Sequence, residues 1–160
     1  MRKVLFLCTG NSARSILAEA LLNHLGGQRF RAYSAGSRPT GTVNPHALAT
    51  LRDLGVAAPE ARSKNWDEFA APGVPPMDLI ITVCDNAAGE VCPIWPGRPT
   101  TAHWGVPDPA AMTGSEAQVR QAFRDAAVTL QRRIDLLLAL PVSTLEAASI
   151  GDELRAIGRR

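Results

Sequence analysis

Short segments with the composition of buried strands alternate along the chain with longer segments of helical spacing. The strand-like segments lie at residues 4–7, 30–34, 79–83 and 100–103. The helical patterns begin at Ser15, Asn44 and Ser115, where apolar residues start to recur at the spacing of a helix face. This alternation predicts one α/β domain whose parallel sheet is covered by helices on both faces.

We expect the four strands in the order 2-1-3-4, which places the first strand beside the third. In such a sheet, ligands bind beyond the carboxyl ends of the strands, where the strand order reverses. Cys8 and Cys84 each follow one of these two neighbouring strands directly. Adjacent strands run about 4.8 Å apart, which lies inside the roughly 4.4–6.8 Å between Cα atoms that a disulfide tolerates. The predicted fold therefore brings Cys84 within reach of Cys8.

The C-terminal part of the chain extends the pattern beyond the sheet. Pro141 ends the third long helical segment, and residues 143–157 are predicted to form an additional amphipathic helix. A short helical turn is expected near residues 66–69, within an irregular and proline-rich connection. We therefore expect a main domain over residues 1–140 and a helical extension over residues 141–160.

The segment C-T-G-N-S-A-R-S, residues 8–15, joins the first strand to the first helix. The backbone N–H groups of such a turn converge on one point, and the helix N-terminus adds a partial positive charge. Gly10 relaxes the turn, and the guanidinium of Arg14 can grip two oxygens of a tetrahedral oxyanion. We expect an oxyanion cradle formed by Thr9, Gly10, Asn11, Ser12, Ala13 and Arg14.

The positive field of this cradle favours a thiolate over a thiol at Cys8. We therefore expect a depressed pKa for Cys8 and a nucleophilic sulfur at neutral pH. The hydroxyl of Ser15 can donate a hydrogen bond to that thiolate. The competing interpretation is a buried cysteine at a strand end, followed by a turn that merely caps the helix.

Composition narrows the classes of protein that remain. The 160 residues, 46% hydrophobic and 20% charged, suit one domain with a sizeable core. A net charge of +2 is too small to favour nucleic-acid binding, and neither a membrane span nor a signal peptide is evident. Three cysteines fit no secreted disulfide framework. We therefore expect a cytoplasmic protein with catalytic or redox-active cysteines.

Several motifs together resemble those of the cysteine-relay arsenate reductases, which share the low-molecular-weight tyrosine phosphatase fold. Besides residues 8–15, they are Tyr33-Ser34-Ala35-Gly36, Val43-Asn44-Pro45, Val83-Cys84, Cys92-Pro93, His103-Trp104-Gly105 and Asp108-Pro109. The resemblance covers about residues 1–140. It implies a nucleophile at Cys8, an oxyanion-binding arginine at Arg14 and a general acid at Asp108. It also implies two relay thiols, Cys84 and Cys92.

The reaction that the resemblance implies is the reduction of arsenate to arsenite for arsenic detoxification. Arsenate mimics phosphate, so phosphate and sulfate should compete for the cradle while the Cys8 thiolate attacks arsenic. A Cys8–Cys84 disulfide and then a Cys84–Cys92 disulfide would follow by thiol–disulfide exchange. An external dithiol, thioredoxin or a glutaredoxin-type reductant, would restore the thiols without a bound cofactor or metal. Trp95, beside the relay segment, could contact that reductant.

Two other function classes remain open. A low-molecular-weight phosphatase acting on phosphotyrosine needs Cys8, Arg14 and Asp108 but neither of the other two cysteines. Phosphotyrosine enzymes of the family usually carry a tyrosine after Asp-Pro and an aromatic residue after the second strand. Here Ala110 takes the first position, and residues 37–43 contain no aromatic side chain. A non-catalytic oxyanion-binding module is disfavoured, because the nucleophile, arginine and acid are all present.

Individual residues also have simpler interpretations. Cys84 can be an inert buried residue at a strand end, and Asp108 can be only a turn former before a proline. Cys92 can be an ordinary loop residue, or a zinc ligand together with Cys84 and His103. The seven residues between the two cysteines are not a zinc-knuckle spacing, and no fourth ligand is evident.

A potassium site is known in some thioredoxin-coupled members of this group, formed by asparagine, glutamate, serine and aspartate. Asn11, Glu19 and Ser34 match the first three, but Lys64 occupies the position of the aspartate. The lysine ammonium would fill the place of the ion and neutralise Glu19, which makes bound potassium unnecessary. The alternative is that Lys64 points into solvent.

Overall fold

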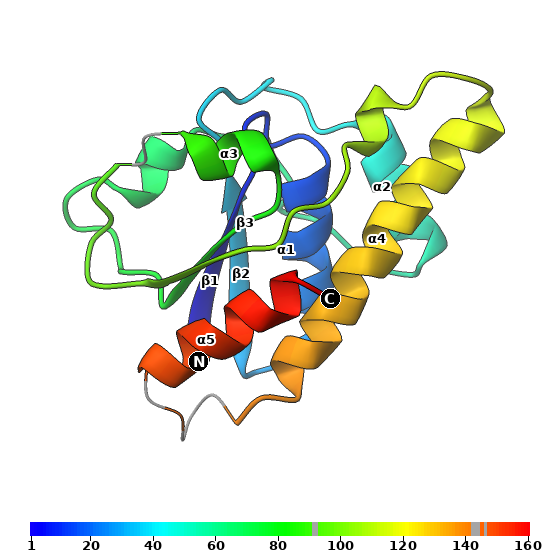
Figure 1. Cartoon of the computed structure of the whole chain (residues 1–160). Helices are drawn as coiled ribbons and strands as arrows, with labels where there is room; N and C mark the ends of the chain where they lie inside the picture. Colours follow the sequence, from blue (N-terminus) through cyan, green and yellow to red (C-terminus); the bar gives the residue numbers. More distant parts are fainter. Residues whose placement is uncertain (91–92, 142–144, 146) are drawn as a thin grey trace.

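The computed structural model describes residues 1–90, 93–141, 145 and 147–160 (Figure 1). Its sheet contains four strands in the order β2-β1-β3-β4, and every pair is parallel. The strands are β1 Arg2–Leu7, β2 Phe30–Ala35, β3 Leu79–Thr82 and β4 Thr100–His103. The predicted strand order and the parallel sense of the sheet are confirmed. The carboxyl ends of β1 and β3 therefore lie side by side, as Leu7 pairs with Thr82.

Five α-helices and two 3-10 turns connect or flank these strands in the described residues. They are α1 Arg14–Leu25, α2 Pro45–Asp53, η1 Trp66–Phe69, α3 Asp85–Gly89, η2 Pro109–Ala111, α4 Glu116–Leu138 and α5 Ala147–Gly158. Both α3 and η2 lie in segments that the sequence pattern predicts as loops, because each is a single turn without apolar periodicity. Over the described ranges, no helix is both long and apolar enough to cross a bilayer.

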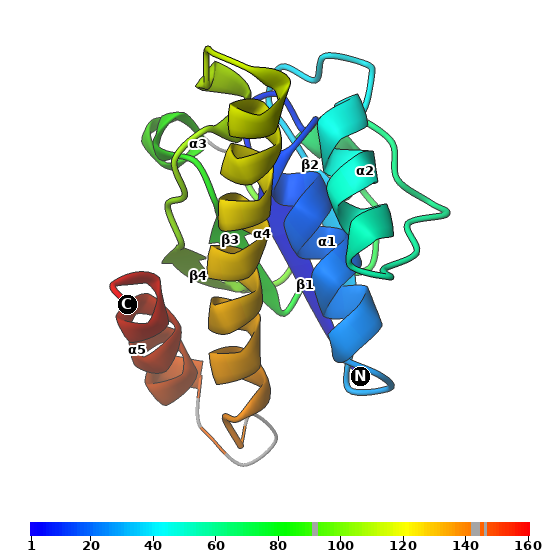
Figure 2. The same cartoon turned by 90° about the vertical axis from the view of Figure 1, so that its right-hand side faces the viewer.

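The two faces of the sheet are covered unequally. Helices α1, α2 and α4 lie on one side (Figure 2), where alternate β1 residues such as Val4 and Phe6 enter the main core. Leu5 and Leu7 point to the opposite face, into a smaller cluster with Trp66 of η1. In the described part of the chain, the 3-10 turn η1 and loop residues replace a full helix on that second face.

Helix α5 packs against β4 at the edge of the sheet (Figure 2). Its residues Ile150, Leu154 and Ile157 are buried in the main core. The indole N–H of Trp104 donates to the carbonyl oxygen of Leu154 at 2.9 Å. The C-terminal helix thus shares the core of the strands, and the division of the chain at residue 140 stays a prediction. Residues 143, 144 and 146 of the predicted extra helix lie outside the described residues.

Candidate active site

The turn between β1 and α1 is fixed by hydrogen bonds that its backbone carbonyl oxygens accept. Four of them accept hydrogen bonds from backbone N–H groups: Thr9 from Arg38 at 3.0 Å, Gly10 from Thr40 at 3.0 Å, Ser12 from Asn44 at 2.8 Å and Ala13 from Leu17 at 2.9 Å. Within the described chain, no protein group accepts from the N–H groups of Asn11, Ser12 or Ala13. With the carbonyls engaged by the surrounding chain, these N–H groups remain available to an anion, as the predicted cradle requires.

Asn11 sets the bend of the cradle. It has a φ of 44°, in the left-handed region that asparagine tolerates better than most residues, and its side chain is fully buried. Its amide nitrogen donates to the hydroxyl of Ser15 at 2.8 Å, and its amide oxygen accepts from the Lys64 N–H at 2.9 Å. The Ser15 hydroxyl is thus first of all a support for Asn11, and its bond to the Cys8 thiolate stays a prediction.

Gly36, at the end of β2, lies against the backbone of the cradle. A Cβ atom at this position would stand 2.3 Å from the carbonyl oxygens of both Cys8 and Thr9. Only glycine permits so close an approach of two backbones. The sequence signal for this role is a glycine that directly follows a strand.

Cys8 and Cys84 are both buried and carry free thiols. The Cys84 sulfur accepts from the N–H groups of Thr9 and Ala87, each at 3.4 Å, and is hydrogen-bonded to Cys8. The bond from Cys8 lowers the pKa of Cys84 to about 5, against the effect of burial, and the two N–H groups add to the lowering. The predicted proximity of the two cysteines therefore agrees with the structure.

The expected depression of the Cys8 pKa is wrong for this state of the protein. The hydrogen bond to Cys84 and burial raise the pKa of Cys8, and together they outweigh the lowering by Arg14 and the Gly10 backbone. Two adjacent thiols share one proton here, and Cys84 has more N–H donors, so the negative charge rests on Cys84. The prediction from the sequence took account of the positive electrostatic field of the cradle but not of the Cys84 sulfur beside Cys8.

Arg14 and Asp108 meet at the mouth of the cradle. Arg14 Nη1 donates to the carbonyl oxygen of Val106 at 2.9 Å, and Nη2 lies 3.7 Å from Asp108 Oδ2. The other oxygen, Asp108 Oδ1, accepts from the Ala110 N–H at 2.9 Å and caps η2. Asp108 is therefore a turn former through one oxygen and faces Arg14 through the other. Both line a cavity of about 600 Å³ with Cys84, Asp85, Gly105, Val106 and Pro107.

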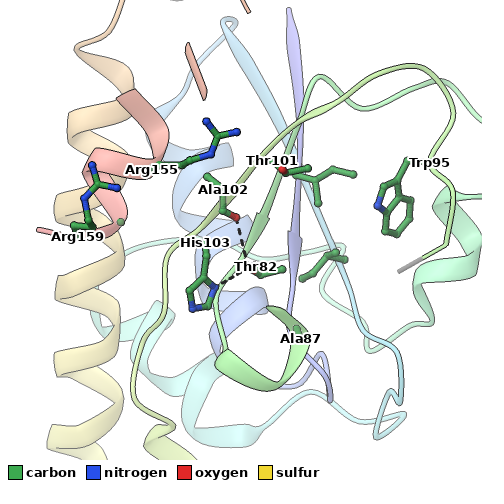
Figure 3. Close-up of a pocket in the computed structure, with 11 residues that line it drawn as sticks. Thr82, Ala87, Trp95, Thr101, Ala102, His103, Arg155 and Arg159 are labelled. Carbon is green, nitrogen blue, oxygen red and sulfur yellow. Dashed lines mark hydrogen bonds between the residues drawn. The ribbon is translucent and has the colours of Figure 1, made fainter. Parts of the chain in front are cut away.

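The third predicted thiol, Cys92, lies outside the described residues. Trp95 packs edge-on against Trp66 with 6.1 Å between the ring centroids. It also lines a second cavity, of about 590 Å³, over Leu7 and Ile80, whose wall includes Ala87 of α3 and Arg155 of α5 (Figure 3). No described contact tests whether Trp95 meets a reductant.

Lys64 and Glu19 lie behind the cradle. Lys64 is only 6% exposed, and its ammonium donates to the Arg62 carbonyl oxygen at 3.0 Å, so the solvent-pointing alternative is wrong. Burial lowers the pKa of Lys64, an effect that Glu19 opposes. Burial raises the pKa of Glu19, while Lys64 and Ser34 lower it. Lys64 supports Asn11 through its backbone N–H and not through its ammonium.

Two further contacts around α3 were not predicted. His103 Nε2 pairs with Asp85 Oδ1 at 2.8 Å, and its Nδ1 pairs with the Thr82 hydroxyl at 2.7 Å. The Thr9 hydroxyl donates to Glu90 Oε1 at 2.7 Å. The sequence places His103 at the end of the fourth strand and both acids between Cys84 and Cys92, with no pattern that pairs them. Their nearness in sequence to Cys84 is the signal that could have identified Asp85 and Glu90.

Comparisons with known proteins agree with this geometry. An arsenate reductase of Halalkalibacterium halodurans is 35% identical over 131 residues, which cover 82% of this chain and 91% of the relative. A solved arsenate reductase in its reduced state aligns with a TM-score of 0.67 at 26% identity, over 87% of this chain and 98% of that one. A thioredoxin-dependent arsenate reductase of Corynebacterium glutamicum aligns with a TM-score of 0.56 at 27% identity, over 85% of this chain and 63% of that one.

The comparison with protein families extends over most of the chain. Residues 3–148 match the family described as low molecular weight phosphotyrosine protein phosphatase. This range includes β2, β3, β4 and all of β1 except Arg2, together with the cradle, both described cysteines and Asp108. The chain belongs to the low-molecular-weight phosphotyrosine protein phosphatase family.

Proposed function

We propose that this protein reduces arsenate to arsenite through a relay of cysteine thiols. The observation that carries the proposal is the hydrogen-bonded pair of Cys8 and Cys84 at the cradle, since ester hydrolysis needs only one of these thiols. Relatives named arsenate reductase at 35% identity support the same substrate. The cradle N–H groups and Arg14 would hold the oxyanion, with phosphate and sulfate as competitors.

The first step joins Cys8 to arsenic. The proton of the Cys8 thiol passes along its hydrogen bond to the Cys84 sulfur, and the resulting thiolate attacks arsenic. Asp108 protonates the oxygen that departs, which leaves as water. The Asp108 Oδ2 atom, which lies 3.7 Å from Arg14 Nη2 and does not cap η2, is the oxygen that would carry this proton. The product is a Cys8 thioester of pentavalent arsenic.

The second step transfers two electrons to arsenic. Cys84 loses its proton to solvent, and the N–H groups of Thr9 and Ala87 favour the thiolate that remains. This thiolate attacks the Cys8 sulfur, so that a sulfur–sulfur bond forms and the sulfur–arsenic bond breaks. The electron pair of the broken bond stays on arsenic, which leaves as trivalent arsenite. The two thiolates are oxidised to one disulfide.

The relay then returns the cradle to its starting state. Cys92 attacks the Cys84 sulfur, which forms a Cys84–Cys92 disulfide and releases the Cys8 thiolate. An external dithiol protein of the thioredoxin type reduces this disulfide, and no bound cofactor takes part. The similarity to a thioredoxin-dependent enzyme favours this reductant over a glutaredoxin-type one. Such a cycle belongs in a reducing compartment, which favours the cytoplasm.

We propose further that Lys64 makes potassium unnecessary behind the cradle. Its buried ammonium offsets the charge of Glu19 in place of a monovalent cation. Replacing potassium by sodium at constant ionic strength should leave both activity and Tm unchanged, whereas Lys64→Ala should lower both. Specific activation of the unmodified protein by potassium would contradict this role.

The proposed function is tested by two parallel assays. NADPH consumption with arsenate, thioredoxin and thioredoxin reductase is measured beside the hydrolysis of p-nitrophenyl phosphate. Cys8→Ser should abolish both activities, while Cys84→Ser and Cys92→Ser should abolish only arsenate turnover. Hydrolysis of the ester without arsenate turnover in the unmodified protein would favour the phosphatase alternative. Equal loss of both activities in Cys84→Ser would indicate a structural role for this residue.

A further inference from the structure

The start of α3 is tied to the sheet by a chain of side chains. Asp85, the first residue of α3, pairs with His103 Nε2 at 2.8 Å. Figure 3 shows the next contact, in which His103 Nδ1 pairs with the hydroxyl of Thr82 at 2.7 Å. The backbone of Gly105 lies against this pair: a Cβ atom there would stand 2.8 Å from His103 Nε2 and 2.9 Å from Asp85 Oδ1. The chain of contacts thus joins α3 to the ends of both β3 and β4.

The other end of α3 is tied to the cradle. Glu90 follows the last residue of α3 and accepts from the Thr9 hydroxyl at 2.7 Å. The Thr9 hydroxyl has a single hydrogen, and the bond to Glu90 uses it. Thr9 therefore donates to the Cys84 sulfur through its backbone N–H. Glu90 therefore sets both the distance of α3 from the cradle and the way in which Thr9 meets Cys84.

Cys84 directly precedes α3 and is the neighbour of Asp85, and its sulfur accepts from the Ala87 N–H of α3. A single helical turn has no stability of its own, because nucleation fixes several backbone dihedral angles for each hydrogen bond gained. The sheet holds the chain as far as Val83, whose N–H donates to Leu7 and whose carbonyl oxygen accepts from Val106. The position of α3, and with it the Ala87 N–H that donates to the Cys84 sulfur, must therefore come from contacts outside α3.

We infer that Asp85 with His103, and Glu90 with Thr9, are two side-chain tethers that place the Cys84 sulfur for its attack on Cys8. Asp85, His103 and Glu90 are positioning residues, since they act through α3. The inference rests on the proposed function for its meaning in catalysis. The position of the Cys84 sulfur relative to Cys8 does not depend on arsenate chemistry. It can be measured with any reagent that oxidises the two thiols to a disulfide.

The test measures how fast the Cys8–Cys84 disulfide forms in the full chain carrying Cys92→Ser. Arsenate drives one arm, and diamide, a two-electron thiol oxidant that does not need the cradle, drives the other. Quenched samples are analysed by peptide mass mapping. Asp85→Ala and Glu90→Ala should each slow both arms about three- to fivefold, and the double variant about tenfold or more, as exposed ion pairs and single hydrogen bonds allow.

Conservative variants separate placement from general damage. Asp85→Asn and Glu90→Gln keep an acceptor oxygen and should stay within about twofold of the parent. Glu116→Ala removes a matched exposed acid, 3.1 Å from His46, and should leave both rates unchanged. Phosphate affinity and Tm should also stay constant in every variant, because none of these changes alters a backbone N–H group of the cradle or Arg14.

Three results would overturn the inference: alanine variants as fast as the parent, asparagine and glutamine variants as slow as alanine, or slowing matched by lost phosphate affinity. If arsenate forms no disulfide in the parent while diamide does, the proposed function fails. The role of the two tethers is then tested only by the rate at which diamide forms the Cys8–Cys84 disulfide.

Discussion

The cradle and the α3 segment meet at one pair of sulfurs but are held in different ways. The cradle is fixed by backbone hydrogen bonds at its outer carbonyls and by the fully buried Asn11. The α3 segment is one turn long and is held through the side chains of Asp85, which is 92% exposed, and Glu90. Burial and multiple bonds fix the cradle, whereas α3 depends on side-chain contacts, of which the exposed Asp85–His103 pair is worth at most about 1 kcal/mol. Cys84 lies at the junction of the sheet with the more weakly held of the two segments.

The first prediction removes the acid at the border of the two regions. Asp108→Asn should slow the arsenate-driven chemical step by about 10²–10⁴-fold, the usual contribution of a general acid. Binding of phosphate should change little, because the cradle alone holds the anion. Single-turnover disulfide formation and phosphate inhibition measure the two effects separately. A normal single-turnover rate would remove Asp108 from the mechanism.

The second prediction weakens the cradle itself. Arg14→Lys keeps the charge but loses the planar fork that donates to Val106 and lies beside Asp108. Affinity for phosphate should fall about 10- to 100-fold, in line with the loss of charge-assisted hydrogen bonds, and the rate with arsenate should fall as well. Competitive inhibition by phosphate provides the measurement. Unchanged inhibition would show that Arg14 does not touch the anion.

The third prediction addresses the rigidity of the cradle. Asn11→Ala removes two buried hydrogen bonds and puts alanine at a φ of 44°, which should lower the free energy of unfolding by about 2–4 kcal/mol. Asn11→Gly accepts that φ without strain and should lose less. Denaturant unfolding measures both variants. A loss in glycine equal to that in alanine would assign the effect to the hydrogen bonds alone.

The fourth prediction concerns the proton that the two regions share. Alkylation of Cys84 by iodoacetamide should rise with pH through a midpoint near the pKa of about 5 and then level off, because only the thiolate reacts. Cys8→Ala removes the donated hydrogen bond and should move this midpoint upward. The Thr9 and Ala87 N–H groups remain and limit the shift. Mass mapping identifies the labelled residue, and an unmoved midpoint would deny the role of Cys8 as donor.

Sequence patterns predicted the features that follow from the regular alternation of strands and helices along the chain. The order of the strands, the cradle after β1 and the approach of Cys84 to Cys8 all follow from where strands end in a parallel sheet. The location of the shared proton did not follow, since it depends on which sulfur receives more N–H donors. Likewise α3, one turn without periodicity, has no pattern of its own, and its contact with His103 joins residues that are distant in sequence.

The protonated state of Cys8 has a consequence for survival under oxidative conditions. Peroxides attack thiolates much faster than thiols, and over-oxidised cysteine is not recovered by ordinary reductants. With the charge on Cys84, the proposed nucleophile Cys8 is the less vulnerable of the two sulfurs, and it is only 5% exposed. A sulfenic acid formed on Cys84 lies beside the Cys8 thiol and condenses with it into a disulfide. The product of oxidation is then a Cys8–Cys84 disulfide, which a dithiol reductant can reduce.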